Sequence, residues 1–285
     1  MAAETSRPIT TVGVVRHPNI PASNPLADAI LYAVRQHGVK AWDCVGLDGT
    51  ETLERVAQTD LLVTLGGDGS ILRAARAAAG HPTLILGINL GRMGFLTETE
   101  PERWQEVLPR VLRGDYWVEE RMMLRGEARR EDHLLAQEEA LNDVVVGQGV
   151  LGRIVRLEVY VDGEPLTTYV ADGLIVATPT GSTAYALAAG GPIMPPRQRN
   201  ILLVPVAPHL SLDRAVVLAE GARVQVVVRG HSPAALALDG QNVIQLRAGD
   251  EVQVSASPHV ARFARVRERG YFYRTLMARL VPREG

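Results

Sequence analysis

One carboxylate lies among three glycines in the segment Gly66-Gly67-Asp68-Gly69-Ser70, which directly follows the apolar run Leu61–Leu65. Strong helix formers continue over Ile71–Ala79, so the pattern predicts a strand, a tight turn and a helix. This arrangement places a functional group at the carboxyl end of a parallel sheet. Asp68 is therefore a candidate either to hold a metal ion or to accept a proton from a nucleophilic hydroxyl.

The glycines of this segment suit a phosphate group. Gly66, Gly67 and Gly69 can adopt positive φ and let a ligand approach the backbone closely. Their amides, near a helix N-terminus, would bind a phosphate, whereas the charge of Asp68 would repel one. An Asp-Gly turn with a helix cap is the structural alternative, and the segment alone leaves both interpretations open.

A second concentration of functional groups runs from Asp172 to Tyr185. A strand pattern leads into a turn around Pro179 and Gly181, and the helix that follows ends sharply at Gly190-Gly191-Pro192. Four hydroxyl side chains lie in this turn: Thr178, Thr180, Ser182 and Thr183. Helix caps explain some of them. The gathering of hydroxyls and small residues with an aspartate and a tyrosine favours a pocket for a flat heterocycle.

Two further segments could bind a ligand or form ordinary turns. Asn142-Asp143 stands beside an apolar strand pattern, where an amide and a carboxylate could chelate a ribose diol or simply make a turn. The glycine-rich stretch Gly87–Leu96 follows another strand, but it lacks the full fingerprint of a dinucleotide-binding turn. No Walker A sequence occurs, and Lys40 is the only lysine, so a lysine-based site is not expected.

Strands and helices alternate up to about residue 120, which predicts a parallel α/β sheet. From Met122 onward, runs rich in Val, Leu and Tyr alternate with turns, and Asp162-Gly163 is expected to form a hairpin. We therefore expect a Rossmann-like α/β domain over 1–121 and 266–285, with its last helix returning to it, and a β-rich domain over 122–265. The expected strands are 11–15, 39–45, 61–65, 83–89, 139–146, 154–161, 167–170, 174–177, 201–206, 215–218, 223–228, 234–238, 243–246 and 251–255, and the expected helices are 26–37, 71–79, 101–113, 183–189 and 271–280.

The composition is typical of a soluble globular protein, with 285 residues of which 46% are apolar and 22% charged. A formal net charge of −2 gives no electrostatic case for nucleic acid or a membrane surface as partner. The single cysteine, Cys44, cannot form an internal disulfide, and no zinc-ligand spacing occurs. The N-terminal residues lack an apolar signal core and no stretch is long enough to span a bilayer, so a cytoplasmic location is expected.

In this order, the motifs resemble those of the NAD kinase family over most of the chain, from about Val12 to Leu280. The matching segments are Gly66–Ser70, Gly87–Leu96, Leu141–Asp143, Asp172–Tyr185 and Gly190–Ile193, with Pro208-His209, Arg214 and Phe272–Leu276 as further similar segments. The combined match is specific. The Gly-Gly-Asp-Gly-Ser turn alone is not, because phosphofructokinases share it and lipid kinases carry a similar one.

The resemblance implies an enzyme that uses ATP and a divalent metal ion, Mg²⁺, to phosphorylate the 2′-hydroxyl of the adenosine ribose of NAD, forming NADP. By similarity, Asp68 would be the proton acceptor, and Gly66, Gly67 and Gly69 would lie at the phosphates. Asn142 with Asp143 would bind ribose, Asp172 would hold the nicotinamide side, and Thr183 to Ala188 would line the adenine pocket. The implied NAD-binding residues are Asp68, Gly69, Arg73, Asn142, Asp143, Arg153, Asp172, Thr180, Thr183, Ala184, Tyr185, Ala188 and Gln241. Family members usually form homodimers or homotetramers.

Four positions depart from the commonest family pattern. Ser70 replaces the usual Thr and keeps the hydroxyl, and Asp143 replaces Glu and is one methylene shorter. Ala188 replaces Ser and loses a hydrogen-bonding group, and Val170 stands where some members carry a basic residue.

Two other functions are compatible with parts of the pattern. A sugar or lipid kinase could use the same glycine turn, although a lipid kinase should also show a hydrophobic acyl site. An NAD- or NADH-binding regulator without catalysis would not need Asp68 beside phosphate-binding amides. The phosphate donor, whether ATP, another nucleoside triphosphate or polyphosphate, is open at this stage.

Overall fold

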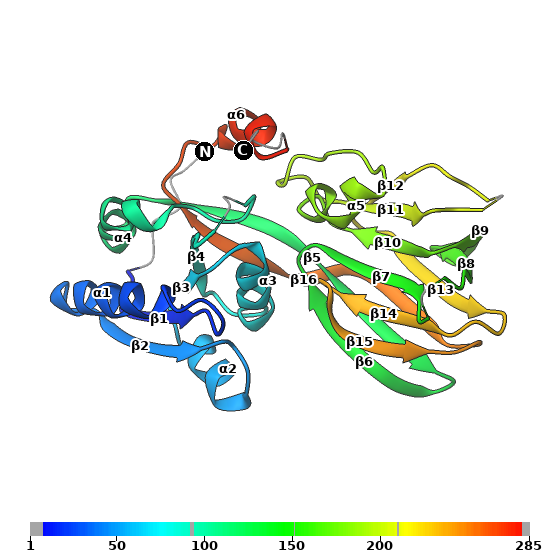
Figure 1. Cartoon of the computed structure of the whole chain (residues 1–285), viewed down its shortest axis with the longest axis horizontal. Coiled ribbons are helices and arrows are strands. Elements are labelled where there is room, and N and C mark those ends of the chain that lie inside the picture. The colour runs from blue at the N-terminus through cyan, green and yellow to red at the C-terminus, as the bar shows by residue number, and fades with distance from the viewer. Residues whose placement is uncertain (1–7, 92–93, 151, 210, 281–285) are drawn as a thin grey trace. The chain divides into compact units, whose positions relative to one another are not determined.

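The computed structural model describes residues 8–91, 94–150, 152–209 and 211–280 (Figure 1). The chain forms two compact units, Met1–Glu120 with Ala261–Gly285, and Arg121–Val260. Two long strands, β5 (Trp117–Arg130) and β16 (Glu251–Arg265), each belong partly to one unit and partly to the other. The predicted fold class, an α/β part followed by a β-rich part, is confirmed.

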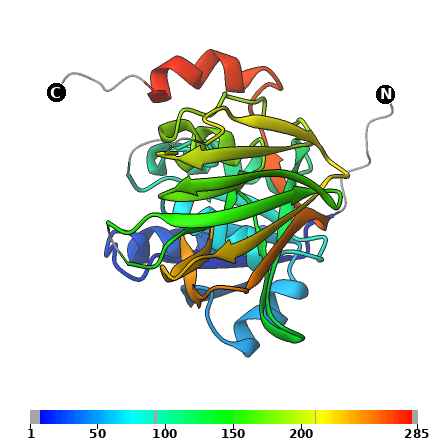
Figure 2. The ribbon, with the colours of Figure 1, turned by 90° about the vertical axis from the view of Figure 1, so that its right-hand side faces the viewer.

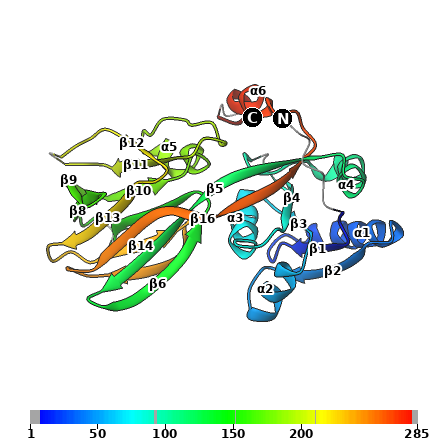
Figure 3. The ribbon, with the colours of Figure 1, turned by 180° about the vertical axis from the view of Figure 1, so that it is seen from behind.

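The first unit contains a parallel sheet with the strand order β2-β1-β3-β4, extended by the C-terminal end of β16. These strands are β1 (Thr11–Arg16), β2 (Lys40–Val45), β3 (Leu61–Leu65) and β4 (Leu84–Ile88). Every residue of β3 and β4 is buried, as expected for central strands of a parallel sheet. Figure 3 shows β16 running beside β4 in this unit.

Helices connect the parallel strands, as the alternating sequence pattern predicts. They are α1 (Ser23–Gln36), α2 (Thr50–Ala57), α3 (Asp68–Ala77) and α4 (Trp104–Leu112), with a short 3₁₀ turn η1 (Pro101–Arg103) before α4. Helix α2 was not predicted: it is only eight residues long and Val56 is its only buried residue. The last helix, α6 (Tyr271–Leu280), belongs to the first unit as predicted.

The second unit contains a six-stranded antiparallel sheet, visible as green to gold arrows in Figure 2, with the order β12-β11-β10-β7-β14-β15. Its strands are β7 (Asp143–Gln148), β10 (Gly173–Ala177), β11 (Asn200–Val206), β12 (Val216–Ala219), β14 (Ala234–Leu238) and β15 (Gln241–Leu246). One face of this sheet carries the short elements η2 (Gly181–Thr183) and α5 (Tyr185–Ala188).

A second layer of antiparallel strands completes this unit. It consists of β8 (Val155–Val161), β9 (Glu164–Ala171), β13 (Arg223–Arg229), the N-terminal part of β16, and the β5–β6 hairpin with β6 at His133–Ala140. Apolar side chains from both layers form one core, with Tyr169 among its largest fully buried members. The predicted Asp162-Gly163 hairpin joins β8 to β9, with positive φ at both residues.

Two expected elements are each interrupted in the structure. The predicted strand 139–146 is broken into β6 and β7, because Leu141 and Asn142 donate their amides to the carboxylate of Asp239 instead of to a neighbouring strand. The predicted helix 183–189 is split into η2 and α5, because Ala184 lies between them with φ −105° and ψ −128°, which no helix adopts. Both differences fall in segments that the sequence analysis connects with a ligand.

Replacing Gly13 by alanine is expected to destabilise the first unit. The new methyl group would lie 2.6 Å from Cζ2 of Trp42, whose ring is held by a 2.9 Å hydrogen bond to Thr59 and by the Arg55 guanidinium 4.3 Å from its centroid. Overpacking of this kind costs about 1–3 kcal/mol. Chemical denaturation should show that loss for Gly13→Ala and almost none for Gly270→Ala, where a methyl group meets no atom within 4 Å. An unchanged unfolding free energy for Gly13→Ala would show that the ring moves aside freely.

Candidate functional site

The turn between β3 and α3 places Asp68 at the first residue of a helix. Gly66 has φ +155°, and a Cβ atom there would lie 2.3 Å from Oγ of Ser70, so only glycine fits. Gly67 is the N-cap residue with φ −92°, and Gly69 lies inside the helix. The sequence suggested that all three glycines can adopt positive φ, and of the three only Gly66 does so.

The Asp68 carboxylate is held by the second glycine-rich turn. Its Oδ2 accepts a 2.8 Å hydrogen bond from the amide of Phe95, and its Oδ1 accepts a 3.1 Å bond from the amide of Leu96. A Cβ atom on Gly94 would lie 2.0 Å from Oδ1, so the absence of a side chain there makes room for the carboxylate. The sequence left Gly87–Leu96 between a weak nucleotide motif and a structural turn, and its last three residues, 94–96, orient Asp68.

Asp68 retains acceptor capacity after these two bonds. Each carboxylate oxygen has a second lone pair, and the residue is half-buried rather than sealed in the core. Gly69 is exposed on the first turn of α3, and half-buried Arg73 follows it four residues later on the same helical face. The amide of Gly66, in contrast, already donates a 3.0 Å hydrogen bond to the carbonyl of Ile88. Among the three glycines, the amides of Gly67 and Gly69 are therefore the candidates for binding a phosphate.

In the second unit, Asp239 holds the segment Leu141–Asp143. Its Oδ2 accepts a 2.9 Å hydrogen bond from the amide of Leu141, and its Oδ1 accepts bonds of 2.7 Å and 3.2 Å from the next two amides. Asp239 has φ +51° and forms with Gly240 the tight turn between β14 and β15, so Gln241 directly follows it. Asp239 was not among the predicted site residues. Its Asp-Gly dipeptide between two expected strands is a pattern typical of a hairpin, but no local pattern identifies partners 98 residues away.

The turn after β10 docks onto the same segment. The amide of Thr178 donates to the carbonyl of Asn142 at 2.9 Å, and its hydroxyl donates to the carbonyl of Leu141 at 2.6 Å. A Cβ atom on Gly181 would lie 2.1 Å from the carbonyl oxygen of Asn142. The structure therefore brings the predicted ribose pair and the hydroxyl-rich turn into direct backbone contact.

Three of the four hydroxyl groups of this turn, those of Thr178, Ser182 and Thr183, donate to backbone carbonyls. Oγ of Ser182 donates to the carbonyl of Pro179 at 2.7 Å and accepts from the amide of Met194 at 2.9 Å. The Thr183 hydroxyl donates to the carbonyl of Thr180 at 3.2 Å. The hydroxyl cluster therefore builds the turn, which revises the sequence argument that the number of hydroxyls itself indicates a pocket.

The side chains that the turn presents outward are Tyr185, which is 47% exposed, and Ala188, which is also exposed. Ala184 is half-buried before them, whereas Thr180 is buried and accepts a 3.4 Å hydrogen bond from Nη1 of Arg121. An exposed aromatic ring beside small residues offers a flat apolar surface. Such a surface suits the stacking of a heterocycle.

Asp143 is a buried carboxylate of this region, with 5% exposure, and Asp239 beside it is buried as well. Burial, with a further contribution from the neighbouring charge of Asp239, raises the pKa of Asp143 to about 7. It pairs with Ala177 across β7 and β10 and lies on the sheet face away from Val144 and Val146, which belong to the main core. A carboxyl group with this pKa can act as donor or acceptor near neutral pH.

Two predicted residues lie at the other end of β10. Asp172 directly precedes β10, whereas Asp143 pairs with Ala177 at the other end of that strand. The two residues are therefore separated by the length of β10, about five residues or roughly 16 Å. Its carbonyl accepts a 2.9 Å bond from the amide of Gln148, and Oε1 of Gln148 accepts a 3.2 Å bond from the amide of Arg153. Asp172 and exposed Arg153 thus form a second group, distinct from the one around Asn142.

The described part of the chain contains no group of three or more His, Cys, Asp or Glu side chains that could hold a metal ion. No helix among the described residues is long and apolar enough to cross a membrane.

Replacing Gly181 by alanine is expected to lower thermal stability, because the methyl group would lie 2.1 Å from a backbone oxygen that cannot rotate away. A clash of this kind costs about 1–3 kcal/mol, or roughly 2–10 °C in Tm for a chain of this size. Differential scanning calorimetry measures the shift. Gly221→Ala is the matched control, because a methyl group there meets no atom within 4 Å. Equal Tm values for the two variants would contradict the close approach.

The raised pKa of Asp143 predicts a pH-dependent stability. Between about pH 4 and pH 7 the unfolded chain has lost this proton while the folded chain keeps it, so stability falls as pH rises through this window. Asp143→Asn removes this titration. The unfolding free energy of the variant minus that of the wild type should therefore increase by up to about 4 kcal/mol between pH 4 and a pH above 7. Asp213→Asn, at an exposed position, controls for the change in net charge. A difference between Asp143→Asn and wild type that stays constant with pH would contradict the buried acid.

Comparison with known proteins covers both units. Residues 26–116 match the family model of the ATP-NAD kinase N-terminal domain, and residues 141–266 match that of the ATP-NAD kinase C-terminal domain. The NAD kinase of Chloroflexus aggregans is 43% identical over 264 residues, which cover 90% of this chain and 96% of that protein. The NAD kinase of Dehalococcoides mccartyi is 36% identical over 270 residues, which cover 94% and 95% of the two chains.

Solved structures extend the comparison to the fold. The crystal structure of yeast NADH kinase complexed with NADH has a TM-score of 0.83 and 25% identity, covering 98% of this chain and 91% of that one. The crystal structure of an NAD kinase from Archaeoglobus fulgidus in complex with ATP has a TM-score of 0.77 and 27% identity, covering 94% and 98%. With two family models matched and identities of this size over nearly the whole length, the chain belongs to the NAD kinase family.

Proposed function

We propose that this chain transfers the terminal phosphoryl group of ATP to the 2′-hydroxyl of the adenosine ribose of NAD, forming NADP and ADP. The observation that carries the proposal is the Asp68 carboxylate, which two backbone amides orient at the first residue of a helix after a glycine turn. The relatives described above are named NAD kinases, and the solved relatives were crystallised with ATP or NADH.

Asp68 is proposed as the general base. A ribose hydroxyl is too weak an acid to ionise unaided near neutral pH, so its proton must leave as the new bond forms. In the proposed step the hydroxyl oxygen bonds to the γ-phosphorus of ATP, the bond from that phosphorus to the bridging oxygen breaks, and ADP departs. The hydroxyl proton passes to the Asp68 carboxylate, which is worth about 10²–10⁴-fold in rate.

The phosphates of the donor are proposed to lie at the N-terminus of α3. The amides of Gly67 and Gly69 and the helix dipole favour negative charge there. Each oxygen of Asp68 already accepts a hydrogen bond from a backbone amide. The described residues contain no cluster of metal ligands. These features fit an Mg²⁺ ion that arrives on the phosphates of ATP and neutralises their charge, rather than one held in a protein cage.

NAD is proposed to contact both groups of the second unit. Asn142 and Asp143 would bind the adenosine ribose, and the surface of Tyr185 beside it would stack the adenine ring. Asp172, at the far end of β10, would hold the nicotinamide side. The remaining proposed NAD contacts are Gly69, Arg73, Arg153, Thr180, Thr183, Ala184, Ala188 and Gln241.

Two further properties stay predictions. Membership of the NAD kinase family favours a homodimer or a homotetramer, and we propose a cytoplasmic location. Size-exclusion chromatography with light scattering gives the mass of the assembly directly.

Asp68→Asn is expected to abolish turnover while NAD still binds. The amide cannot take up a proton, but it preserves the size and shape of the side chain. The protein is incubated with NAD, ATP and Mg²⁺, NADP is measured enzymatically, and NAD binding is measured by calorimetry. We expect the rate to fall by at least about 10²-fold, with the dissociation constant of NAD changing little.

The same assay decides between the proposal and its alternatives. Absence of NADP from the wild type with every donor and metal tested would contradict the proposed activity. Turnover by Asp68→Asn at the wild-type rate would show that Asp68 has a structural role only. Asp28→Asn, which also neutralises one carboxylate of the first unit, is the matched control for net charge and should turn over normally.

A further inference from the structure

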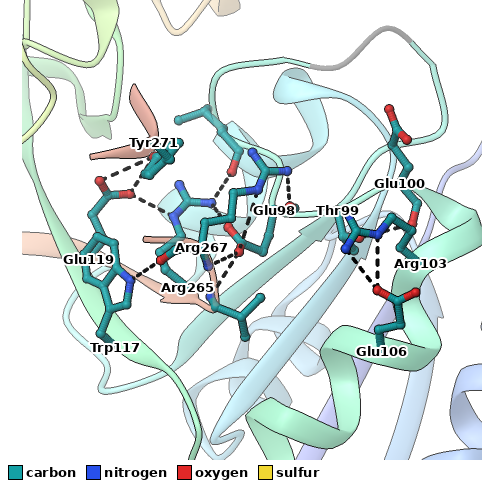
Figure 4. Close-up of polar contacts among 12 residues, drawn as sticks. Glu98, Thr99, Glu100, Arg103, Glu106, Trp117, Glu119, Arg265, Arg267 and Tyr271 are labelled. Atoms are coloured by element: carbon teal, nitrogen blue, oxygen red, sulfur yellow. Dashed lines mark hydrogen bonds and ion pairs between the residues drawn. The ribbon is translucent and has the colours of Figure 1, made fainter. Parts of the chain in front are cut away.

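A buried ionic cluster lies in the first unit, outside the set of predicted site residues (Figure 4). Arg265, at the end of β16, has no exposed surface. Its Nε donates to Oε2 of Glu119 at 2.8 Å, and its Nη1 donates to Oε2 of Glu98 at 3.2 Å. The hydroxyl of Tyr271 donates to Glu119 at 3.1 Å. Burial would lower the pKa of Arg265, but the neighbouring oxygens of Tyr271, Glu119 and Glu98 raise it overall.

This cluster reaches the proposed base through one residue. Nη1 of Arg265 also donates a 2.9 Å hydrogen bond to the carbonyl of Leu96. The backbone amide of Leu96 donates to Oδ1 of Asp68 at 3.1 Å. Leu96 therefore accepts from the buried guanidinium with its carbonyl and donates to the carboxylate with its amide.

Other contacts fasten the same segment to the chain that follows Arg265. Oε1 of Glu98 accepts 3.0 Å hydrogen bonds from the amides of Val266 and Arg267, and the Arg267 guanidinium donates to the carbonyl of Glu98. The ring of Phe95 lies 6.4 Å from that of Phe272 in α6. The segment 95–98 is thus held against 265–272, a part of the chain about 170 residues later.

We propose that Arg265 is a positioning residue for Asp68, because it fixes the segment 95–98 in the place from which two amides orient the carboxylate. The kinetic part of this proposal rests on the proposed function. Arginine suits the role because its planar fork donates to a carbonyl and two carboxylates from fixed directions. Lysine would keep the charge and lose that geometry.

The alternative is that the cluster only stabilises the fold. A buried ion pair costs several kcal/mol when one partner is removed, so loss of stability alone does not distinguish the two roles. A positioning role requires in addition that the amides of Phe95 and Leu96 lose their bonds to Asp68 in a protein that remains folded.

The first measurement is hydrogen–deuterium exchange of the Phe95 and Leu96 amides in wild type, Arg265→Lys and Arg262→Lys, under conditions where all three are folded by circular dichroism. Arg262 lies on the same strand and forms a partly exposed pair with Glu120, so it is the matched control. We expect exchange of the two amides to rise at least about tenfold in Arg265→Lys and to stay at the wild-type rate in Arg262→Lys. Should Arg265→Lys fail to fold, Glu119→Gln tests the same cluster and should change exchange in the same direction. Unchanged exchange in the folded variant would overturn the proposal.

The second measurement is the split between kcat and KM. We expect kcat of Arg265→Lys to fall about 10- to 100-fold, because a misplaced base loses rate, while KM for NAD stays within about twofold. Wild-type kcat in Arg265→Lys would overturn the positioning role. If the wild type itself makes no NADP, the proposed function fails, and the exchange measurement still decides whether Arg265 orders the segment that holds Asp68.

Discussion

Two backbone amides orient the carboxylate of Asp68, and several features of the first unit serve this contact. Asp68 begins a helix, where the dipole favours its charge, and the amides of Phe95 and Leu96 fix the direction of its two oxygens. The contact demands glycine at two places. Gly66 takes a conformation that a side chain would strain, and Gly94 leaves the space that the carboxylate occupies. A base that is already oriented does not have to be ordered during the reaction.

The second unit uses an aspartate in a similar way for a different purpose. Asp239 accepts hydrogen bonds from three consecutive amides, and these bonds interrupt the strand between β6 and β7. This break leaves Asn142 outside the ladder and puts Asp143 at the first position of β7. Asp239 is satisfied by amides, whereas burial and the nearby charge of Asp239 raise the pKa of Asp143. One carboxylate therefore supports the backbone, and the other is the one that we propose binds the ribose.

The hydroxyl-rich turn illustrates how composition and role can separate. Its hydroxyls looked like ligand contacts in the sequence, yet those of Thr178, Ser182 and Thr183 donate to carbonyls of the same or the adjoining segment. They hold the turn in its conformation. The residues that we propose for recognition are the ones that the turn exposes, above all Tyr185.

The sequence by itself determined the two classes of sheet, the chemical identity of the proposed base and the order of most elements, although α2 and β5 were not predicted. Apolar runs such as Leu61–Leu65 and the glycine turn after them are local patterns, and local patterns are legible without the fold. Tertiary structure alone decided how that base is held. The partners of Asp68 lie 27 and 28 residues away, and Arg265 lies 169 residues beyond the carbonyl that it contacts. Such contacts depend on strand register and chain packing, which no local pattern of residue types contains.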